Sequence, residues 1–431
     1  MKKYLNKRTV MLLIIFIYIF FLGFKFLKGK SLFDTIVEYS NNIYSVNADI
    51  NNATRDDYSL MNSVYIPIKY IDYRKTGFGR YIVRKEDDDN LYLYNPVDEE
   101  ESLFIKIEPN FKLYELAVSD VWVVWLEISE TNKDSENISW RICAKMINSD
   151  NRFLLDEGIV NSKDKKEYIK FLPREFKIEE DIFVYTKYSE NIIDKSNIVT
   201  TSITTSIIEY NLKDKKNKVI NSSYDNYKEE LSNIRIDGNN IIWKKKYKDY
   251  KKNETTKVEV YKYCISTSII EKIFETSDVY TLDIKGDNIA IVVKNPEDNI
   301  MVYNIEDKSF TNIFYKGSRI EKFIRGDSDN PAIVEVKFIT PQKLFIAVSS
   351  EKDNISAIVY DLEQKEFLNF DKEVYGKDDT SLIQYSVNKN KLLAYVGIRI
   401  KNNTDEDISI KNKKLRKIET LYYKYFEYLI R

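Results

Sequence analysis

Carboxylates, lysines and tyrosines are the residues of this chain that could do chemistry, because it has no histidine and only two cysteines. Without histidine, the chain's own residues cannot form a Ser-His-Asp triad, a histidine metal site or the usual pH switch near neutrality. Cys143 and Cys264 fall in different repeats of the pattern described below, so we expect two small core residues rather than a disulfide. We therefore predict no catalytic residue, no metal and no cofactor.

Two acidic clusters, residues 85–90 (KEDDDN) and 97–102 (VDEEES), hold enough carboxylates to be considered as cation sites. Neither has the glycine-punctuated spacing of a calcium loop, and solvated Asp and Glu are common in turns. Carboxylates alone can hydrolyse glycosides when two of them face each other across a pocket. A carboxylate-based, glycan-active enzyme is therefore the alternative function that the sequence leaves open.

A basic and aromatic stretch at residues 244–252 (KKKYKDYKK) is the strongest candidate for a binding surface. It overlaps one of three long loops between strands, expected at residues 128–138, 188–205 and 246–257, and long loops in compact domains are commonly functional. We predict that a protein or an envelope polymer binds the ridge that these loops form; a solvated lysine-rich loop is the alternative. The residues predicted to contact the partner are Lys244, Lys245, Tyr247, Lys248, Tyr250, Lys251, Lys252 and Tyr188.

Two short patterns recur along the chain and predict the elements that position these residues. The first is a turn of Asp, Asn or Gly followed by an apolar strand, as in residues 237–246 (DGNNIIWKKK) and 286–294 (GDNIAIVVK). The second is a β-run that ends in Tyr followed by Asn or Asp, then a charged turn and another β-run, as in residues 299–313 (NIMVYNIEDKSFTNI). The aligned tyrosines are Tyr94, Tyr210, Tyr303 and Tyr360. Together with an alternating run before the first turn, each unit contains four strands.

Four strands per unit, repeated at intervals of roughly 40–60 residues, are typical of a β-propeller. We predict an all-β, seven-bladed β-propeller of four-stranded antiparallel blades over residues 61–423, with six blades as the alternative. The predicted units are residues 62–107, 112–157, 172–221, 229–275, 278–316, 332–370 and 381–423. Residues 413–431 fit either a final strand or a helix.

The sequence of the N-terminus predicts a membrane segment. Residues 1–30 hold an apolar run flanked by lysines on both sides, close to the length that spans a bilayer. We predict an uncleaved signal anchor, with one transmembrane helix that crosses the cytoplasmic membrane through residues 9–27. The N-terminus would lie inside and the propeller outside, joined by a polar tether at residues 31–60. A cleaved signal peptide is the rival interpretation.

The strand spacing and the Asp or Asn turn before an apolar strand give the chain a family likeness. Over roughly residues 60–423 it resembles bacterial extracytoplasmic β-propellers of the TolB-like type, with a membrane anchor added. The resemblance implies a partner-binding scaffold and transfers no catalytic residue. A formal net charge of −1 argues against nucleic acid as the partner. We therefore expect a membrane-anchored, non-catalytic binding scaffold rather than an enzyme.

Overall fold

The computed structural model describes residues 42–430 with several gaps. The residues inside this range that lie outside the description are 47, 49, 53–57, 68–69, 77–78, 86–87, 130–136, 162–167, 196–197, 224–227, 250–253, 277–278, 294–298, 326–331, 350–354, 370–379, 389–390 and 401–419. The predicted anchor at residues 1–30 therefore falls outside the described residues, as do the first residues of the predicted tether. Among the described helices, none has the length and apolar character of a membrane-spanning segment.

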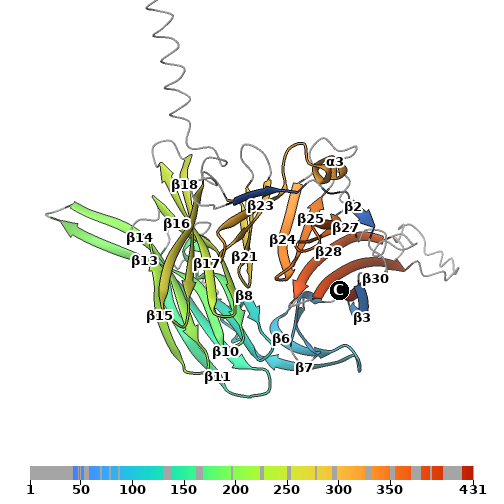
Figure 1. Ribbon diagram of the computed structural model, residues 1–431. Coiled ribbons are helices and arrows are strands. Elements are labelled where there is room, and N and C mark those ends of the chain that lie inside the picture. Colours follow the sequence, from blue (N-terminus) through green and yellow to red (C-terminus); the bar gives the residue numbers. More distant parts are fainter. Residues whose placement is uncertain are drawn as a thin grey trace, which may run out of the picture.

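The described strands form seven sheets that follow one another along the chain (Figure 1). Five sheets are built from consecutive groups of strands: β4 (Tyr70–Lys75), β5 (Tyr81–Lys85), β6 (Asp88–Asn95) and β7 (Glu100–Ile105); β8 (Phe111–Val118), β9 (Trp122–Ser129), β10 (Asn137–Met146) and β11 (Arg152–Asn161); β12 (Arg174–Glu179), β13 (Ile182–Lys195), β14 (Ile198–Asn211) and β15 (Lys216–Ser222); β16 (Glu229–Asp237), β17 (Asn240–Asp249), β18 (Glu254–Cys264) and β19 (Ile269–Thr276); and β20 (Thr281–Lys285), β21 (Asn288–Val293), β22 (Asn299–Asn304) and β23 (Ser309–Phe314).

The remaining two sheets come from the last part of the chain and one strand near its start. They contain β24 (Ala332–Thr340), β25 (Lys343–Ser349), β26 (Ile355–Asp361) and β27 (Glu366–Asn369), and then β28 (Thr380–Asn388), β29 (Lys391–Ile400), β30 (Thr420–Ile430) and β3 (Tyr58–Pro67). Within each group of four, neighbouring strands pair antiparallel. The prediction of an all-β, propeller-like chain with four-stranded antiparallel sheets is confirmed at this level.

The turn before the last strand has the same feature in five sheets. One non-glycine residue in it adopts a positive φ between 53° and 58°: Glu99, Lys215, Ser268, Lys308 and Lys365. The Asn or Asp at the start of the turn stabilises it, as where Asp361 Oδ1 accepts the backbone N–H groups of Glu363 and Gln364, each at 2.9 Å. This Asx bond explains why Asn or Asp follows the aligned tyrosine in a glycine-poor chain.

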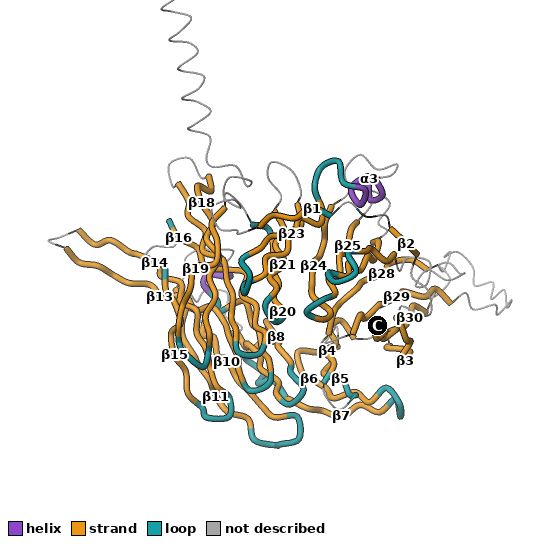
Figure 2. Tube along the Cα trace, in the orientation of Figure 1, coloured by secondary structure: helices purple, strands orange, loops and turns teal. Residues whose placement is uncertain are grey.

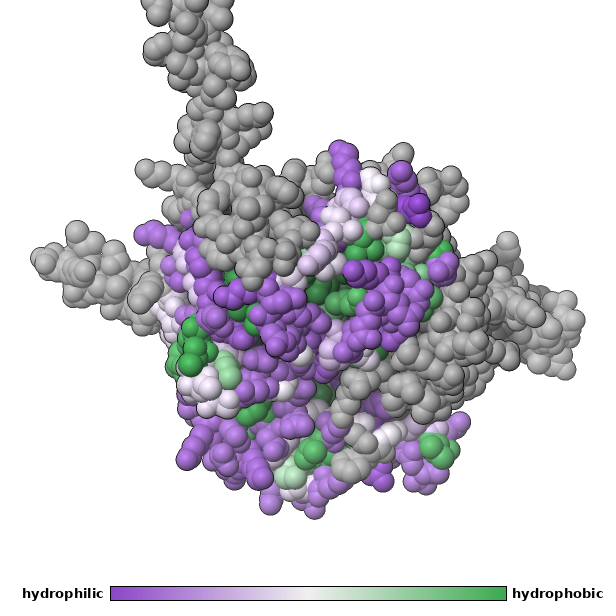
Figure 3. Space-filling view, in the orientation of Figure 1, coloured by the Kyte–Doolittle hydropathy of each residue, from purple (hydrophilic) through white to green (hydrophobic). Residues whose placement is uncertain are grey.

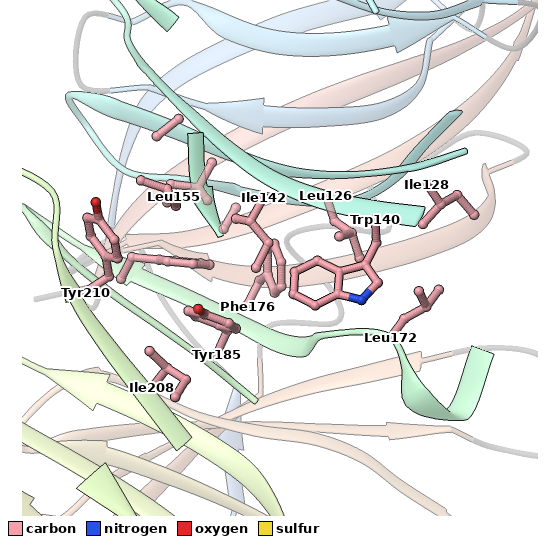
Figure 4. Close-up of a cluster of buried hydrophobic side chains, with 14 of the residues drawn as sticks. Leu126, Ile128, Trp140, Ile142, Leu155, Leu172, Phe176, Tyr185, Ile208 and Tyr210 are labelled. Carbon is pink, nitrogen blue, oxygen red and sulfur yellow. The ribbon is translucent and has the colours of Figure 1, made fainter. Parts of the chain in front are cut away.

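Apolar clusters fill the space between adjacent sheets, because a sheet with two apolar faces must bury both. Between the second and third sheets, Leu126 of β9 and Trp140 of β10 lie in one cluster with Phe176 of β12 and Tyr185 of β13 (Figure 4). Comparable clusters lie between the other successive sheets from β4 to β27. The first strands of successive sheets, such as β12, β16, β20 and β24, lie side by side, with β8, β20 and β24 near the middle of Figure 2.

The N-terminal segment joins three sheets that are otherwise made from the second half of the chain. β1 (Asn42–Ser45) pairs in parallel with β23, and β2 (Ile50–Asn52) pairs in parallel with β27. β3 pairs antiparallel with β30 and so completes the last sheet. The sequence had placed part of β3 in the first unit, because its alternating residues look like any other strand and its partner lies more than 350 residues away. Residues 420–430 form a strand.

Two of the three predicted long loops are mainly strand. β13 and β14 run through residues 188–205 as one long hairpin, which projects from the molecule in Figure 1. β17 and β18 likewise extend to Asp249 and from Glu254. The Thr and Ile residues of 192–204 favour extended backbone. This preference outweighs the tendency of the neighbouring polar residues to form a loop. The third predicted loop lies mostly at residues 130–136, outside the described residues.

Candidate functional site

Charged side chains gather where the first strands of five successive sheets come together. On these strands buried apolar residues alternate with half-buried charged ones, as in Leu282-Asp283-Ile284 of β20. Because successive side chains of a strand point to opposite faces, the charged residues share one side. We call this group the axial cluster; its members are Glu115, Glu175, Lys177, Arg235, Asp283, Glu335 and Lys337.

Asp283 is the best-connected member of the axial cluster. Its Oδ1 lies 3.8 Å from Nε of Arg235 on the preceding sheet. Its Oδ2 accepts the backbone N–H of Phe338, on the following sheet, at 2.7 Å. The side chain of Asp283 keeps only 15% of its surface exposed, so one carboxylate links three adjacent sheets in a largely dry place. Lys337 forms an ion pair with Glu335 on the same strand.

Two members of the cluster have pKa values moved toward neutrality. Burial raises the pKa of Asp283 to about 6, against the opposing attraction of Arg235. Burial also lowers the pKa of Lys177, and the nearby cations of Arg235 and Lys337 lower it further, while Glu175 and Glu115 act in the opposite direction. Shifted pKa values of this kind, caused by burial and neighbouring charges, are common in functional sites.

The sequence analysis missed the axial cluster. Its signal was present, since the first strand of each unit carries a charge at an alternating position, as in LYELAVS, REFKIEE and VYTLDIK. These charges look like the solvent side of an ordinary strand. Only the arrangement of sheets around a common centre shows that this side faces the other sheets.

Four of the residues predicted to bind a partner, Lys244, Lys245, Tyr247 and Lys248, lie on β17 of the fourth sheet. Each has a partner in that sheet or beside it. Lys245 pairs with Glu229 at 2.8 Å, and Lys248 forms an ion pair with Glu230. Lys244 donates to the backbone oxygen of Val279 at 2.8 Å. Tyr250, Lys251 and Lys252 lie outside the described residues. The partner site therefore stays a prediction for all eight residues.

Tyr247 belongs to a buried network centred on Glu259, whose side chain is 6% exposed. Glu259 accepts hydrogen bonds from the hydroxyl groups of Tyr247 and Tyr261, both at 2.7 Å, and from Lys257 Nζ at 2.9 Å. Burial opposes these partners, but they hold the pKa of Glu259 at about 2. Such a fully bonded carboxylate is a structural anchor for β17 and β18. Tyr188, from the third sheet, lies instead beside a cavity next to Trp140, between the second and third sheets.

Cys143 and Cys264 are both free, as expected from their positions in different repeats. Cys143 is buried in β10, as expected of a core residue. The same expectation is wrong for Cys264, which ends β18 and is only partly buried.

No protein-family model matches this sequence, and no curated protein is similar to it. Several peptidases are among the solved structures that have a similar arrangement of strands. An acylaminoacyl peptidase from Pyrococcus horikoshii is 12% identical with a TM-score of 0.47, over 81% of this chain and 51% of that one. Prolyl oligopeptidase B from Galerina marginata is 8% identical with a TM-score of 0.49, over 76% and 47%. This chain therefore spans about half the length of those peptidases.

The β-propeller domain of the Trilobed protease from Pyrococcus furiosus is covered more completely. It is 11% identical with a TM-score of 0.47, over 78% of this chain and 90% of that domain. The succession of four-stranded antiparallel sheets along this chain supports the β-propeller part of the family resemblance drawn from the sequence. The TolB-like and membrane-envelope parts of that resemblance are not supported.

These comparisons contradict the predictions of a non-catalytic binding scaffold and of a chain that is no enzyme. The similar structures are of acylaminoacyl peptidases, prolyl endopeptidases and a puromycin hydrolase. The prediction of a chain that is no enzyme relied on the absence of histidine. The lack of histidine excludes His-based catalysis by this chain's own residues, but it does not exclude a role of the propeller in a peptidase.

Proposed function

We propose that this chain is the β-propeller part of a peptide-hydrolysing protein and that its axial cluster contacts the peptide. The observation that carries the proposal is the half-buried, mixed-charge cluster where the first strands of five sheets meet. In the same proposal the seven sheets form one seven-bladed propeller, which the pairing of β3 with β30 closes.

The chemistry of the axial cluster suits a peptide. An extended peptide carries N–H donors and carbonyl acceptors along its length and a charge at each end. The cluster offers carboxylates of Glu115, Glu175 and Asp283 as acceptors and the cations of Lys177 and Arg235 as donors. Because Asp283 and Arg235 are largely removed from water, each contact is stronger there than at an exposed surface.

Asp283 also supplies what a histidine-free chain otherwise lacks, which is a side chain that exchanges its proton near neutral pH. Asp283 at a pKa of about 6 is able both to hold and to release a proton under physiological conditions. Lys177, with its lowered pKa, has an amine that gives up its proton more readily than an exposed lysine. We propose that Asp283 assists the proton balance of the bound peptide and that Lys177 helps to position it.

Peptide hydrolysis by the native protein tests the proposal. The full chain, isolated in detergent with any polypeptides that accompany it, is incubated with a defined mixture of synthetic peptides, and cleavage is followed by mass spectrometry. We expect hydrolysis by the wild type and a rate lower by about tenfold or more for Asp283→Asn, since a positioned acid or base is worth at least that much. Asp214→Asn, in the exposed turn before β15, is the matched control and should cleave at the wild-type rate.

Two results would overturn the proposal at different levels. An inactive wild-type preparation rejects the peptidase function as a whole. Equal rates for the wild type and Asp283→Asn, in an active preparation, reject the axial cluster as the peptide-contacting site.

We also propose that residues 9–27 cross the cytoplasmic membrane once, with the N-terminus inside and the propeller outside. The support is the apolar run with lysines on both flanks. We expect the full chain to stay in the membrane pellet after alkaline carbonate extraction. We also expect the propeller to be degraded when protease is added to intact cells whose cytoplasmic membrane is accessible from outside. Release by carbonate, or protection from protease while a known external protein is digested, would refute this topology.

A further inference from the structure

The outer edges of two sheets are covered by strands from the N-terminal segment (Figure 1). β1 lies in parallel beside β23 of the fifth sheet, with Ile43 opposite Phe310. β2 lies in the same way beside β27 of the sixth sheet, with Ile50 opposite Phe367. The outer strand of a sheet in this protein is therefore able to accept an added parallel strand.

Phe310 and Phe367 occupy equivalent positions in their sheets. Each is the second residue after the positive-φ residue of the turn, and each lies opposite an aligned tyrosine, Tyr303 or Tyr360. The ring centres of each Tyr–Phe pair are 4.7 Å apart, and both phenylalanines are at most 1% exposed. Both covered edges thus have a buried apolar residue at this position.

The fourth sheet also has an apolar residue at this position, but it is exposed. Ile270 of β19 is the second residue after Ser268, the positive-φ residue of its turn, and it lies opposite Tyr263. Ile270 is 41% exposed and the adjacent Ile269 is 62% exposed, whereas the face of the molecule seen in Figure 3 is largely hydrophilic. Among the described strands, the fourth sheet ends at β19.

The first and third sheets have polar residues at the same position. Among the described strands these sheets end at β7 and β15, where Glu101 and Asn217 lie opposite the aligned tyrosines. Polar and charged side chains are typical of edge strands that face water, because they oppose pairing with a further strand. At this position the outer strand of the fourth sheet therefore resembles the two covered edges rather than these two.

The sequence before β1 contains a segment with the matching spacing. Ile43 and Ile50 are seven residues apart and lie at equivalent points of neighbouring sheets, so seven residues carry the chain from one outer edge to the next. Ile36, which is outside the described residues, precedes Ile43 by the same seven positions. It belongs to residues 35–38 (TIVE), in which Thr, Ile and Val favour an extended backbone.

We propose that the outer edge of β19 binds residues 35–38 of this chain as an added parallel strand, with Ile36 opposite Ile270. This pairing supplies hydrogen bonds along the edge of β19 and covers part of its two exposed isoleucines. It also continues the path of β1 and β2 along the outer strands, so that the chain enters the propeller at the fourth sheet. The inference goes beyond the proposed function and does not depend on it.

Disulfide cross-linking of the full chain in detergent tests the proposed register. The diagnostic variant combines Val37→Cys with Glu271→Cys, at positions equivalent to Tyr44 and Thr311, which pair in β1 and β23. Tyr44→Cys with Thr311→Cys is the matched positive control, because Cα atoms on directly paired strands lie within the range that a disulfide accepts. Every variant also carries Cys264→Ser, since Cys264 lies on the strand beside β19.

The matched negative control combines Val37→Cys with Lys218→Cys, at the equivalent position of β15 in the third sheet. We expect the diagnostic variant to form an intramolecular disulfide as fast as the positive control. Its rate should exceed that of the negative control by at least about tenfold, because strand pairing raises the effective concentration of the two thiols. Non-reducing electrophoresis separates monomers from dimers, mass spectrometry identifies the bond, and circular dichroism confirms that each variant is folded.

Hydrogen exchange of the wild type provides a second test that needs no substitution. The backbone N–H groups of residues 269–272 should exchange as slowly as those of 309–312, and at least about tenfold more slowly than those of 216–219 on the uncovered edge of β15. Exchange at residues 269–272 as fast as at 216–219 would overturn the inference. Equal disulfide rates in the diagnostic and negative-control variants would do the same. A disulfide between two chains would replace residues 35–38 of the same chain by those of a second copy.

Discussion

Replacement of Asp283 by asparagine is expected to stabilise the folded protein at pH 8 by about 2–3 kcal/mol. Burial gives the folded Asp283 a pKa of about 6, whereas the ordinary value is 3.8. The folded state therefore keeps a proton that the unfolded state loses as the pH rises from about 4 to about 6. Each pH unit in this window costs the wild type about 1.4 kcal/mol of stability relative to a side chain that cannot ionise.

The pH dependence makes this prediction specific. Urea unfolding of the wild type and of Asp283→Asn should give nearly equal free energies at pH 4 and should diverge up to pH 6, with no further divergence above it. Asp214→Asn, at an exposed turn, is the control and should follow the wild type at every pH. A difference between Asp283→Asn and wild type that is the same at pH 4 and pH 8 would show that Asp283 is not held in its protonated form by folding.

A more stable but less active Asp283→Asn protein would show that the buried carboxylate of Asp283 costs stability and contributes to activity. Burial of a carboxylate among other charges costs stability, and such costs are typical of functional sites. The stability measurement needs no assay for activity, so it tests the electrostatics of the axial cluster even if the proposed function fails.

Removal of the Glu127 side chain should destabilise the fold by about 3–5 kcal/mol. Glu127 on β9 is fully buried, accepts Trp125 Nε1–H at 2.6 Å and Arg152 Nη2 at 3.0 Å, and also pairs with Arg141. Glu127→Ala would leave the indole N–H of Trp125 without its acceptor and would remove a buried carboxylate partner from both Arg141 and Arg152. The expected measurement is a lower midpoint of urea unfolding with an unchanged slope.

A graded pair of variants separates the charge from the packing. Glu127→Gln keeps an acceptor oxygen and should lose less stability than Glu127→Ala. Glu271→Ala removes an exposed carboxylate that lies 3.7 Å from Lys262 on the fourth sheet, and it should change the stability by less than about 1 kcal/mol. A loss for Glu127→Ala as small as that for Glu271→Ala would show that the buried network contributes little.

The sequence by itself determined the strands and their repeat. Tyr303 and Tyr360 mark the ends of equivalent strands, and Asn304 and Asp361 cap the turns that follow, because these features depend on residues within a few positions of one another. The same local rules failed at residues 188–205, where polar Thr and Ser residues suggested a loop. Their β-propensity and the cross-strand pairing of β13 with β14 produce a hairpin instead.

Only the tertiary structure decided which distant residues meet. The pairing of β3 with β30, and of β1 and β2 with the outer strands β23 and β27, joins segments that no local pattern relates. The axial cluster and the cavity beside Trp140 arise in the same way, from strands of different sheets. Charge and alternation along a strand show that one side is polar, but what that side faces depends on how the sheets pack. The candidate sites of this protein therefore depend on how its sheets pack, whereas most of the strands can be predicted from local sequence patterns.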